Sequence, residues 1–110
     1  MSKTIFLEAE EIVNNRSEEK ERQYGPFTEG MERAARIASA ATGKNITAPD
    51  MYMMLVALKL SRQSYNHKKD NLLDAIAYLG ALDNYYNEKE QLTESRGTTG
   101  QPWHKESRLI

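Results

Sequence analysis

Hydrophobic residues recur at helical spacing in the first stretch of the chain. Between residues 4 and 15, apolar positions follow the pattern i, i+1, i+4, i+7, i+8, and Glu8, Glu10 and Glu11 form the other face. This spacing places the apolar side chains on one face of a helix. No sustained alternation between apolar and polar residues, which is the pattern of a half-buried strand, appears along the chain. The first stretch therefore predicts an amphipathic helix.

A second helix is expected over residues 27–42, with Phe27, Met31 and several alanines on one face. Small residues on that face allow a neighbouring helix to approach closely. Gly25-Pro26 interrupts the chain before this segment, because a residue that precedes proline is biased away from helix. Gly43 is well placed to end the helix.

A third helix is expected over residues 48–64. Thr47 is a good N-cap, Pro49 suits a first turn, and Asp50 suits the positive end of the helix. The segment is apolar nearly all round through Leu60, which is typical of a helix covered on several sides. Because three partner helices of modest length do not cover such a helix fully, we expect the chain to form a homo-oligomer.

The fourth helix is expected over residues 67–89, and the polar, glycine- and threonine-rich residues that follow predict an unpacked tail. The sequence thus predicts an all-α, antiparallel four-helix domain over residues 1–90, with short loops, and a polar C-terminal tail over residues 91–110. The longest apolar run has only eight residues, 51–58, whereas a membrane span needs about 20. Since Glu8 also interrupts any signal-peptide core, we expect no membrane association and a cytoplasmic location, in the host cell if a phage encodes the chain.

Charge and cysteine content narrow the function classes. The 110 residues carry 15 Lys and Arg against 16 Asp and Glu, a formal net charge of −1, and this balance argues against nucleic acid as a partner. The absence of cysteine excludes disulfides, thiolate metal sites and cysteine nucleophiles. Any bound metal must therefore be a hard cation on oxygen ligands.

Two cations and two acids are expected to meet between the third and fourth helices. If these helices form a hairpin with its turn near residues 65–67, positions equidistant from the turn lie opposite each other. Lys59 then faces Asp74, and Arg62 faces Asp70. One interpretation is a pair of interhelical ion pairs that fix the helix register and add little stability.

The other interpretation is a magnesium and phosphate site. Asp70 and Asp74 have the oxygen ligands that Mg²⁺ prefers, and Lys59 and Arg62 neutralise phosphate charge. Lys69 lies at the start of the fourth helix, where a helix N-terminus favours anions.

Further candidates lie on other segments. Glu29 and Glu32 form an acidic i, i+3 pair that either faces solvent or adds a carboxylate to the metal site. Arg22 and Tyr24 precede the second helix, and Tyr24 is either a base-stacking residue or loop packing. Tyr78 belongs to a tyrosine stripe that serves as core, stacking platform or subunit interface.

Taken in order, these motifs resemble a family of small phage and prophage proteins of unknown function over residues 5–85. The pattern is Arg22-x-Tyr24-Gly25-Pro26, Glu29-x-Met31-Glu32, Ile46-Thr47, Lys59-x-x-Arg62 and Asp70-x-Leu72-x-Asp74-x-x-x-Tyr78. Gly30, Ala77 and position 39 depart from what that family usually has.

More distantly, the chain resembles the MazG-like all-α NTP pyrophosphatases. That resemblance implies a helical, oligomeric protein whose paired acids bind Mg²⁺ and a nucleoside triphosphate. Only Glu29-x-x-Glu32 and Asp70-x-x-x-Asp74 are present here, where the family has E-E-x-x-E followed by E-x-x-D.

Three functional hypotheses follow. The first is a Mg²⁺-dependent pyrophosphohydrolase in which Asp74 and Glu32 are catalytic, Glu29 and Asp70 complete the metal ligands, and metal-bound water attacks. The second is a non-catalytic anti-defence protein that sequesters a cyclic or other signalling nucleotide. The third is a structural, partner-binding helical protein. The paired charges favour a nucleotide or another phosphorylated small molecule as the partner.

Overall fold

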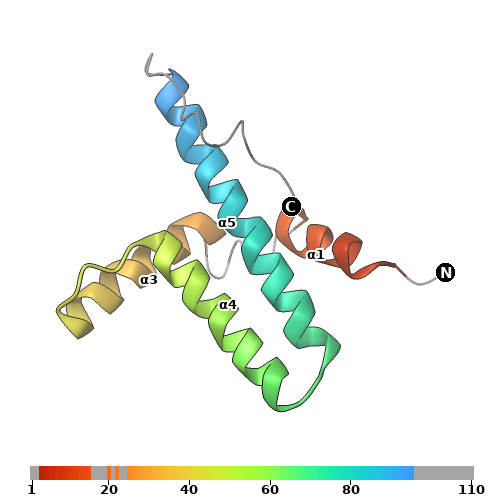
Figure 1. Cartoon of the computed structure of the whole chain (residues 1–110). Coiled ribbons are helices and arrows are strands. Elements are labelled where there is room, and N and C mark those ends of the chain that lie inside the picture. Colours follow the sequence, from red (N-terminus) through yellow and green to blue (C-terminus); the bar gives the residue numbers. More distant parts are fainter. Residues whose placement is uncertain (1–2, 16–19, 21, 23–24, 96–110) are drawn as a thin grey trace, which may run out of the picture.

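The computed structural model describes residues 3–15, 20, 22 and 25–95, with side chains through residue 90. Four helices lie in this part of the chain, which contains no strand (Figure 1). They are α1 (Ile5–Asn14), α3 (Phe27–Thr42), α4 (Ala48–Tyr65) and α5 (Lys69–Ser95). The all-α class and the four expected helices are therefore confirmed. The polar tail lies outside the described residues from position 96 on.

Local sequence explains where the helices begin and end. The Thr4 side chain accepts a hydrogen bond from the Leu7 N–H and caps α1. α3 ends at Gly43, whose φ of 71° lies in the left-handed region that glycine adopts without strain. Thr47 and Asp50 bond reciprocally to each other's backbone N–H and form a capping box that starts α4.

The C-terminal helix is longer than the sequence indicated. α5 continues to Ser95, past residue 89 where we expected it to end. The residues after 89 lack an apolar stripe but contain no proline or glycine before Gly97, so nothing in them stops a helix that is already formed.

α4 and α5 form the central hairpin of the fold, α1 packs against α5, and α3 packs against α4 (Figure 1). The core is a small cluster around Tyr52, which is 0% exposed, with Met31 of α3 and Ala81 of α5. The Tyr52 ring lies 5.9 Å from the rings of both Phe27 and Tyr85, measured between centroids. One tyrosine thus joins three helices.

Within the described residues, no helix is both long and apolar enough to cross a membrane.

Candidate functional site

Lys59 and Asp74 form the ion pair that the hairpin register predicted. The Lys59 Nζ lies 2.8 Å from Asp74 Oδ2, and the Lys59 side chain is only 17% exposed. Asp74 is 38% exposed, so the pair lies at the edge of the α4–α5 contact. The pair fixes which residues of the two helices lie opposite each other.

The second predicted pair does not form. Arg62 and Asp70 are both exposed, and no ion pair joins them among the contacts of the described residues. Asn66 caps the end of α4, and its N–H donates to the carbonyl oxygen of Arg62, so both charges lie near the turn that joins the two helices of the hairpin. Nothing buries these two side chains, and solvent screens their attraction.

Glu32 lies in a separate network at the other end of α5. Its Oε2 accepts from Lys89 Nζ at 2.8 Å and from the Tyr85 hydroxyl at 3.2 Å. The hydrogen bond from Lys89 is the main reason that the pKa of Glu32 lies below its usual value, and desolvation opposes it. Tyr85 is eleven residues from Asp74 along α5, about 16 Å at helical rise.

The four acids predicted as metal ligands are therefore not brought together. Glu29 is exposed on α3, Glu32 pairs with Lys89, and Asp74 pairs with Lys59. No group of three or more histidine, aspartate or glutamate side chains suited to a metal ion occurs in the described part of the chain.

The predicted ligand-binding residues are also dispersed. Lys69 pairs with Glu8 of α1, and Arg22 is exposed. Tyr24 lies outside the described residues. Tyr78 lines a cavity beside α5, whose wall also includes Asp74.

This cavity, which we call the α1–α5 cavity, has a volume of about 460 Å³. That volume is within the usual range for small-molecule sites, roughly 300–1,000 Å³. Its walls come from α1, the beginning of α3, Tyr52 of α4, one face of α5, and Lys20. Aromatic, polar and charged side chains all contribute: Phe27, Thr28, Tyr52, Asp74, Tyr78, Asn84 and Glu88.

The most unusual group beside the cavity is the hydroxyl of Tyr52, a residue that lines it. This hydroxyl has less than 1 Å² of accessible surface, and although the Thr28 hydroxyl is near enough to interact with it, no hydrogen bond of standard geometry joins the two in the described structure. Burial raises the pKa of Tyr52 to about 12, an effect that the neighbouring Thr28 hydroxyl partly opposes. A buried polar group without a partner costs about 1–3 kcal/mol, so its retention needs an explanation.

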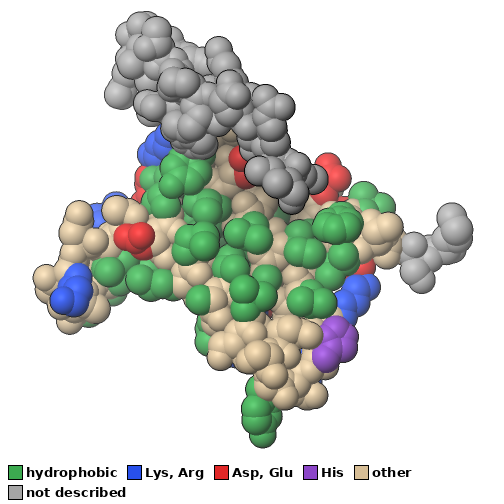
Figure 2. All heavy atoms as spheres, viewed as in Figure 1, with side chains coloured by type: hydrophobic (Ala, Val, Ile, Leu, Met, Phe, Trp, Pro, Cys, Tyr) green, Lys and Arg blue, Asp and Glu red, His purple; other side chains and the backbone are tan. Residues whose placement is uncertain are grey.

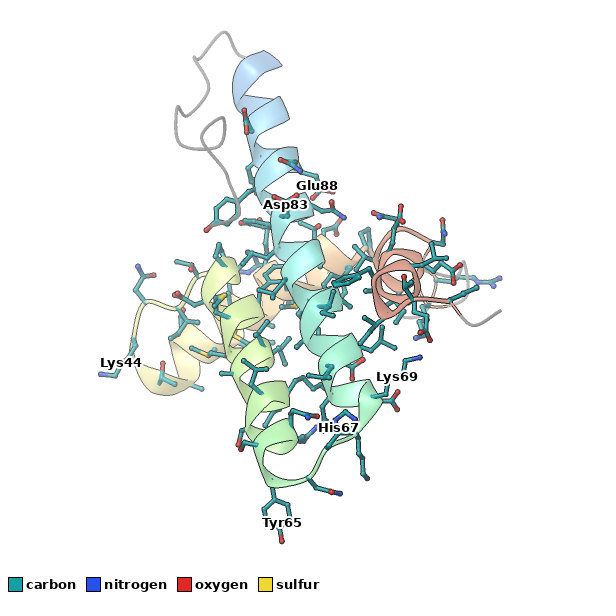
Figure 3. All side chains as sticks on the ribbon, turned by 45° about the vertical axis from the view of Figure 1, so that its right-hand side comes forward. Lys44, Tyr65, His67, Lys69, Asp83 and Glu88 are labelled. Carbon is teal, nitrogen blue, oxygen red and sulfur yellow. The ribbon has the colours of Figure 1, made fainter. Side chains whose placement is uncertain are left out.

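Two hydrogen bonds between side chains that line the cavity join separate helices. The Thr28 hydroxyl donates to Glu88 Oε2 at 2.9 Å and so ties the start of α3 to α5. Asn84 Nδ2 donates to Asn14 Oδ1 at 3.1 Å and ties α5 to α1. Figure 3 shows Glu88 on the part of α5 remote from Lys69, so the wall follows the length of that helix.

Sequence reasoning missed Phe27, Thr28, Tyr52, Asn84 and Glu88 as site residues. Phe27 was placed in a core stripe, and Tyr52 falls inside the apolar run of α4, where an aromatic residue is read as core. No local motif marks the other three. The one available signal was a tyrosine hydroxyl inside an otherwise apolar run, because such a group needs a partner when it is buried.

Comparison with known proteins identifies the family of this chain but does not indicate an activity. The profile of a family described as a domain of unknown function, DUF6378, matches residues 4–86. The chain is also similar to the Gene 55 protein of Mycobacterium phage L5, at 33% identity over 93 residues. That match covers 83% of this chain and 54% of the phage protein, so the chain spans about half the length of this relative. No solved structure matches the chain. The expected relationship to phage proteins of unknown function is thereby confirmed, whereas the resemblance to MazG-like enzymes receives no support.

Proposed function

We propose that this chain, which belongs to the DUF6378 family, binds a nucleotide or a similar phosphorylated small molecule in the α1–α5 cavity and does not hydrolyse it. The observation that carries the proposal is the buried hydroxyl of Tyr52, a residue that lines the cavity, which makes no hydrogen bond of standard geometry. Because this hydroxyl has less than 1 Å² of accessible surface, a ligand would reach it only if a neighbouring side chain moved, and the hydrogen bond so formed would remove the cost of leaving it unpaired.

The chemistry of the remaining wall supports a ligand with a planar ring. Phe27 is 37% exposed and Tyr78 is half-buried, so both rings retain surface for stacking. Stacking of a base on an aromatic side chain contributes about 1–3 kcal/mol and tolerates different bases. Asn84 and Glu88 add hydrogen-bonding groups that suit a base edge or a sugar hydroxyl.

The cations near the cavity support a negatively charged ligand group. Lys20 lines the cavity, and Lys59 borders it through Asp74. Lys59 could bind a phosphate only by exchanging Asp74 for it, because its ammonium now lies 2.8 Å from the Asp74 carboxylate.

Binding is favoured over hydrolysis by the state of the acids. Glu32 and Asp74 were the predicted catalytic pair, but each is engaged by a lysine, and they lie on well-separated parts of the fold. A lysine at 2.8 Å occupies the carboxylate oxygen that a divalent cation would need. This arrangement supports sequestration of a nucleotide messenger over MazG-like pyrophosphate release.

The test is a thermal-shift screen of the full chain. The probes are nucleoside mono-, di- and triphosphates and cyclic mono- and dinucleotides, with and without Mg²⁺. We expect at least one of them to raise the Tm without Mg²⁺, because binding to the native state stabilises it by mass action, by about 2.7 kcal/mol at a hundred times Kd. The bound probe should be recovered intact after denaturation.

Two outcomes contradict the proposal in different ways. If no probe shifts the Tm, nucleotide binding is wrong. If a probe is recovered cleaved and cleavage requires Mg²⁺, binding without hydrolysis is wrong, and the pyrophosphohydrolase with Asp74 as a metal ligand takes its place.

A further inference from the structure

The side of α4 that faces away from the core is exposed and apolar. Met53, Met54, Leu58 and Leu60 on this side are 43–50% exposed. We call this surface, together with Ala57 between them, the outer face of α4. Residues 51–58 include no charged side chain, so a stretch of more than two turns offers neither charge nor hydrogen-bonding group to water.

The apolar surface continues onto α5. The Lys59–Asp74 pair sets an antiparallel register in which Met54 lies level with Leu79, and Leu79 is 46% exposed. Figure 2 shows hydrophobic side chains gathered across the middle of the molecule, over α4 and α5. Exposed apolar side chains thus occur at the same level on both helices.

None of the four described helices covers this surface. α3 and α5 pack against α4, and α1 packs against α5. Among the large side chains of the described residues, only Tyr52 is fully buried, whereas twelve hydrophobic ones are exposed. A small domain with so little core gains much of its stability from additional apolar burial.

We propose that a second copy of this chain covers the outer face of α4 and forms a two-fold dimer. A two-fold axis places the same surface against itself, and this is favourable for a face that lacks charge. The α4–α5 hairpin as a whole offers a flat footprint of roughly 27 by 20 Å, about 540 Å² before side-chain relief is counted. A standard interface buries about 800 Å² of accessible surface per partner, so the outer face of α4 would form the apolar centre of an interface that uses most of the hairpin.

Other occupants fit the surface less well. A nucleic acid or an anionic membrane would need basic side chains, which residues 51–58 lack. A second copy, in contrast, has the same apolar helix and is always present at the same concentration. Two hairpins packed in this way form a four-helix arrangement.

The mass in solution tests the proposal, and the test does not depend on the ligand. Sedimentation velocity of the full chain over a series of concentrations should give a species of twice the 12.6 kDa chain mass that dissociates on dilution. Leu58→Glu should weaken the dimer at least about thirtyfold, because the new carboxylate would be buried at the interface. Met54→Lys should weaken the dimer in the same way. If both variants dissociate, a folding defect of one variant cannot explain the result.

The matched control is Ile37→Glu, which introduces the same charge at an apolar residue of α3 that is 64% exposed. It should leave the dimer intact, and circular dichroism should report equal helix content in all variants. A monomer at every concentration would overturn the proposal. So would a dimer that dissociates in Ile37→Glu and persists in Leu58→Glu.

Discussion

At the scale of single residues, the charges of this protein act mainly as local structural pairs. Lys59 with Asp74 and Glu32 with Lys89 each join one helix to α5. Spacing along the chain was sufficient to predict the first pair, because a hairpin forces equidistant positions together. It was not sufficient for Glu32, because its partners are more than fifty residues away and depend on how α3 docks.

We expect the Lys59–Asp74 pair to set the register without adding much stability. Lys59→Met should lower the free energy of unfolding by up to about 1 kcal/mol, since Asp74 is partly exposed and solvent screens the pair. The double variant Lys59→Met, Asp74→Leu should be at least as stable as the parent. Urea unfolding of the parent, the two single variants and the double variant measures the coupling free energy between the two side chains. A double variant that is less stable than either single one would contradict this role.

The Glu32 network should make stability depend on pH in the acid range. The pKa of Glu32 is lowered in the folded state by the Lys89 hydrogen bond, so its stabilising effect is complete above the unfolded value of 4.5. The effect is lost as the pH falls through the lower folded pKa. Unfolding of the parent and of Glu32→Gln should therefore differ at pH 7 and converge in strong acid. A difference that stays constant with pH would show that the Glu32 charge is irrelevant to stability.

At the scale of helices, the termini were the most predictable feature. Gly43 and the Thr47–Asp50 capping box satisfy backbone groups by chemistry that is local to the sequence. The end of α5 was not predictable in this way, because a polar segment can continue a helix that tertiary contacts have already formed. Periodicity therefore located the elements but not the full length of the last one.

The capping box should contribute measurably to the stability of α4. Thr47→Ala removes the side chain that accepts from the Asp50 N–H, and this should cost about 1 kcal/mol, a fall in Tm of about 5 °C. Thr42→Ala is the matched control, because the exposed Thr42 hydroxyl donates to the Ala38 carbonyl and accepts from the Lys44 N–H, both at the end of α3 and not at the start of α4. Differential scanning calorimetry measures both. Equal losses in the two variants would mean that the cap is not what holds the start of α4.

At the scale of the whole molecule, the cavity could not have been found from the sequence. Its walls come from four helices and Lys20, and the residues that form it are individually unremarkable in the sequence. Asp74 and Tyr78 are the two predicted site residues that line it, the first at the predicted ion pair and the second on the tyrosine stripe. The four acids predicted to bind a metal do not lie together, because docking of α3 places Glu32 beside Lys89.

Tyr52 links the core of the molecule to its proposed activity. Its ring packs against Phe27 and Tyr85 in the centre of the core, while its hydroxyl is buried without a partner at the cavity wall. If that hydroxyl binds the ligand, the ligand-free protein is less stable because the hydroxyl is buried without a hydrogen bond. An apolar residue of the same shape should therefore give a more stable protein that binds the ligand more weakly.

The most direct test is to compare Tyr52→Phe with the parent for both properties, using any nucleotide that shifts the Tm of the parent. The control is Tyr65→Phe, the same change at a tyrosine that is 93% exposed and projects from the hairpin tip (Figure 3). We predict that Tyr52→Phe raises the free energy of unfolding without ligand by about 1 kcal/mol and weakens nucleotide affinity about tenfold, measured by calorimetric titration. The control should change neither. Unchanged affinity in Tyr52→Phe, or a loss of affinity matched by a loss of stability, would contradict the assignment of the cavity as the binding site.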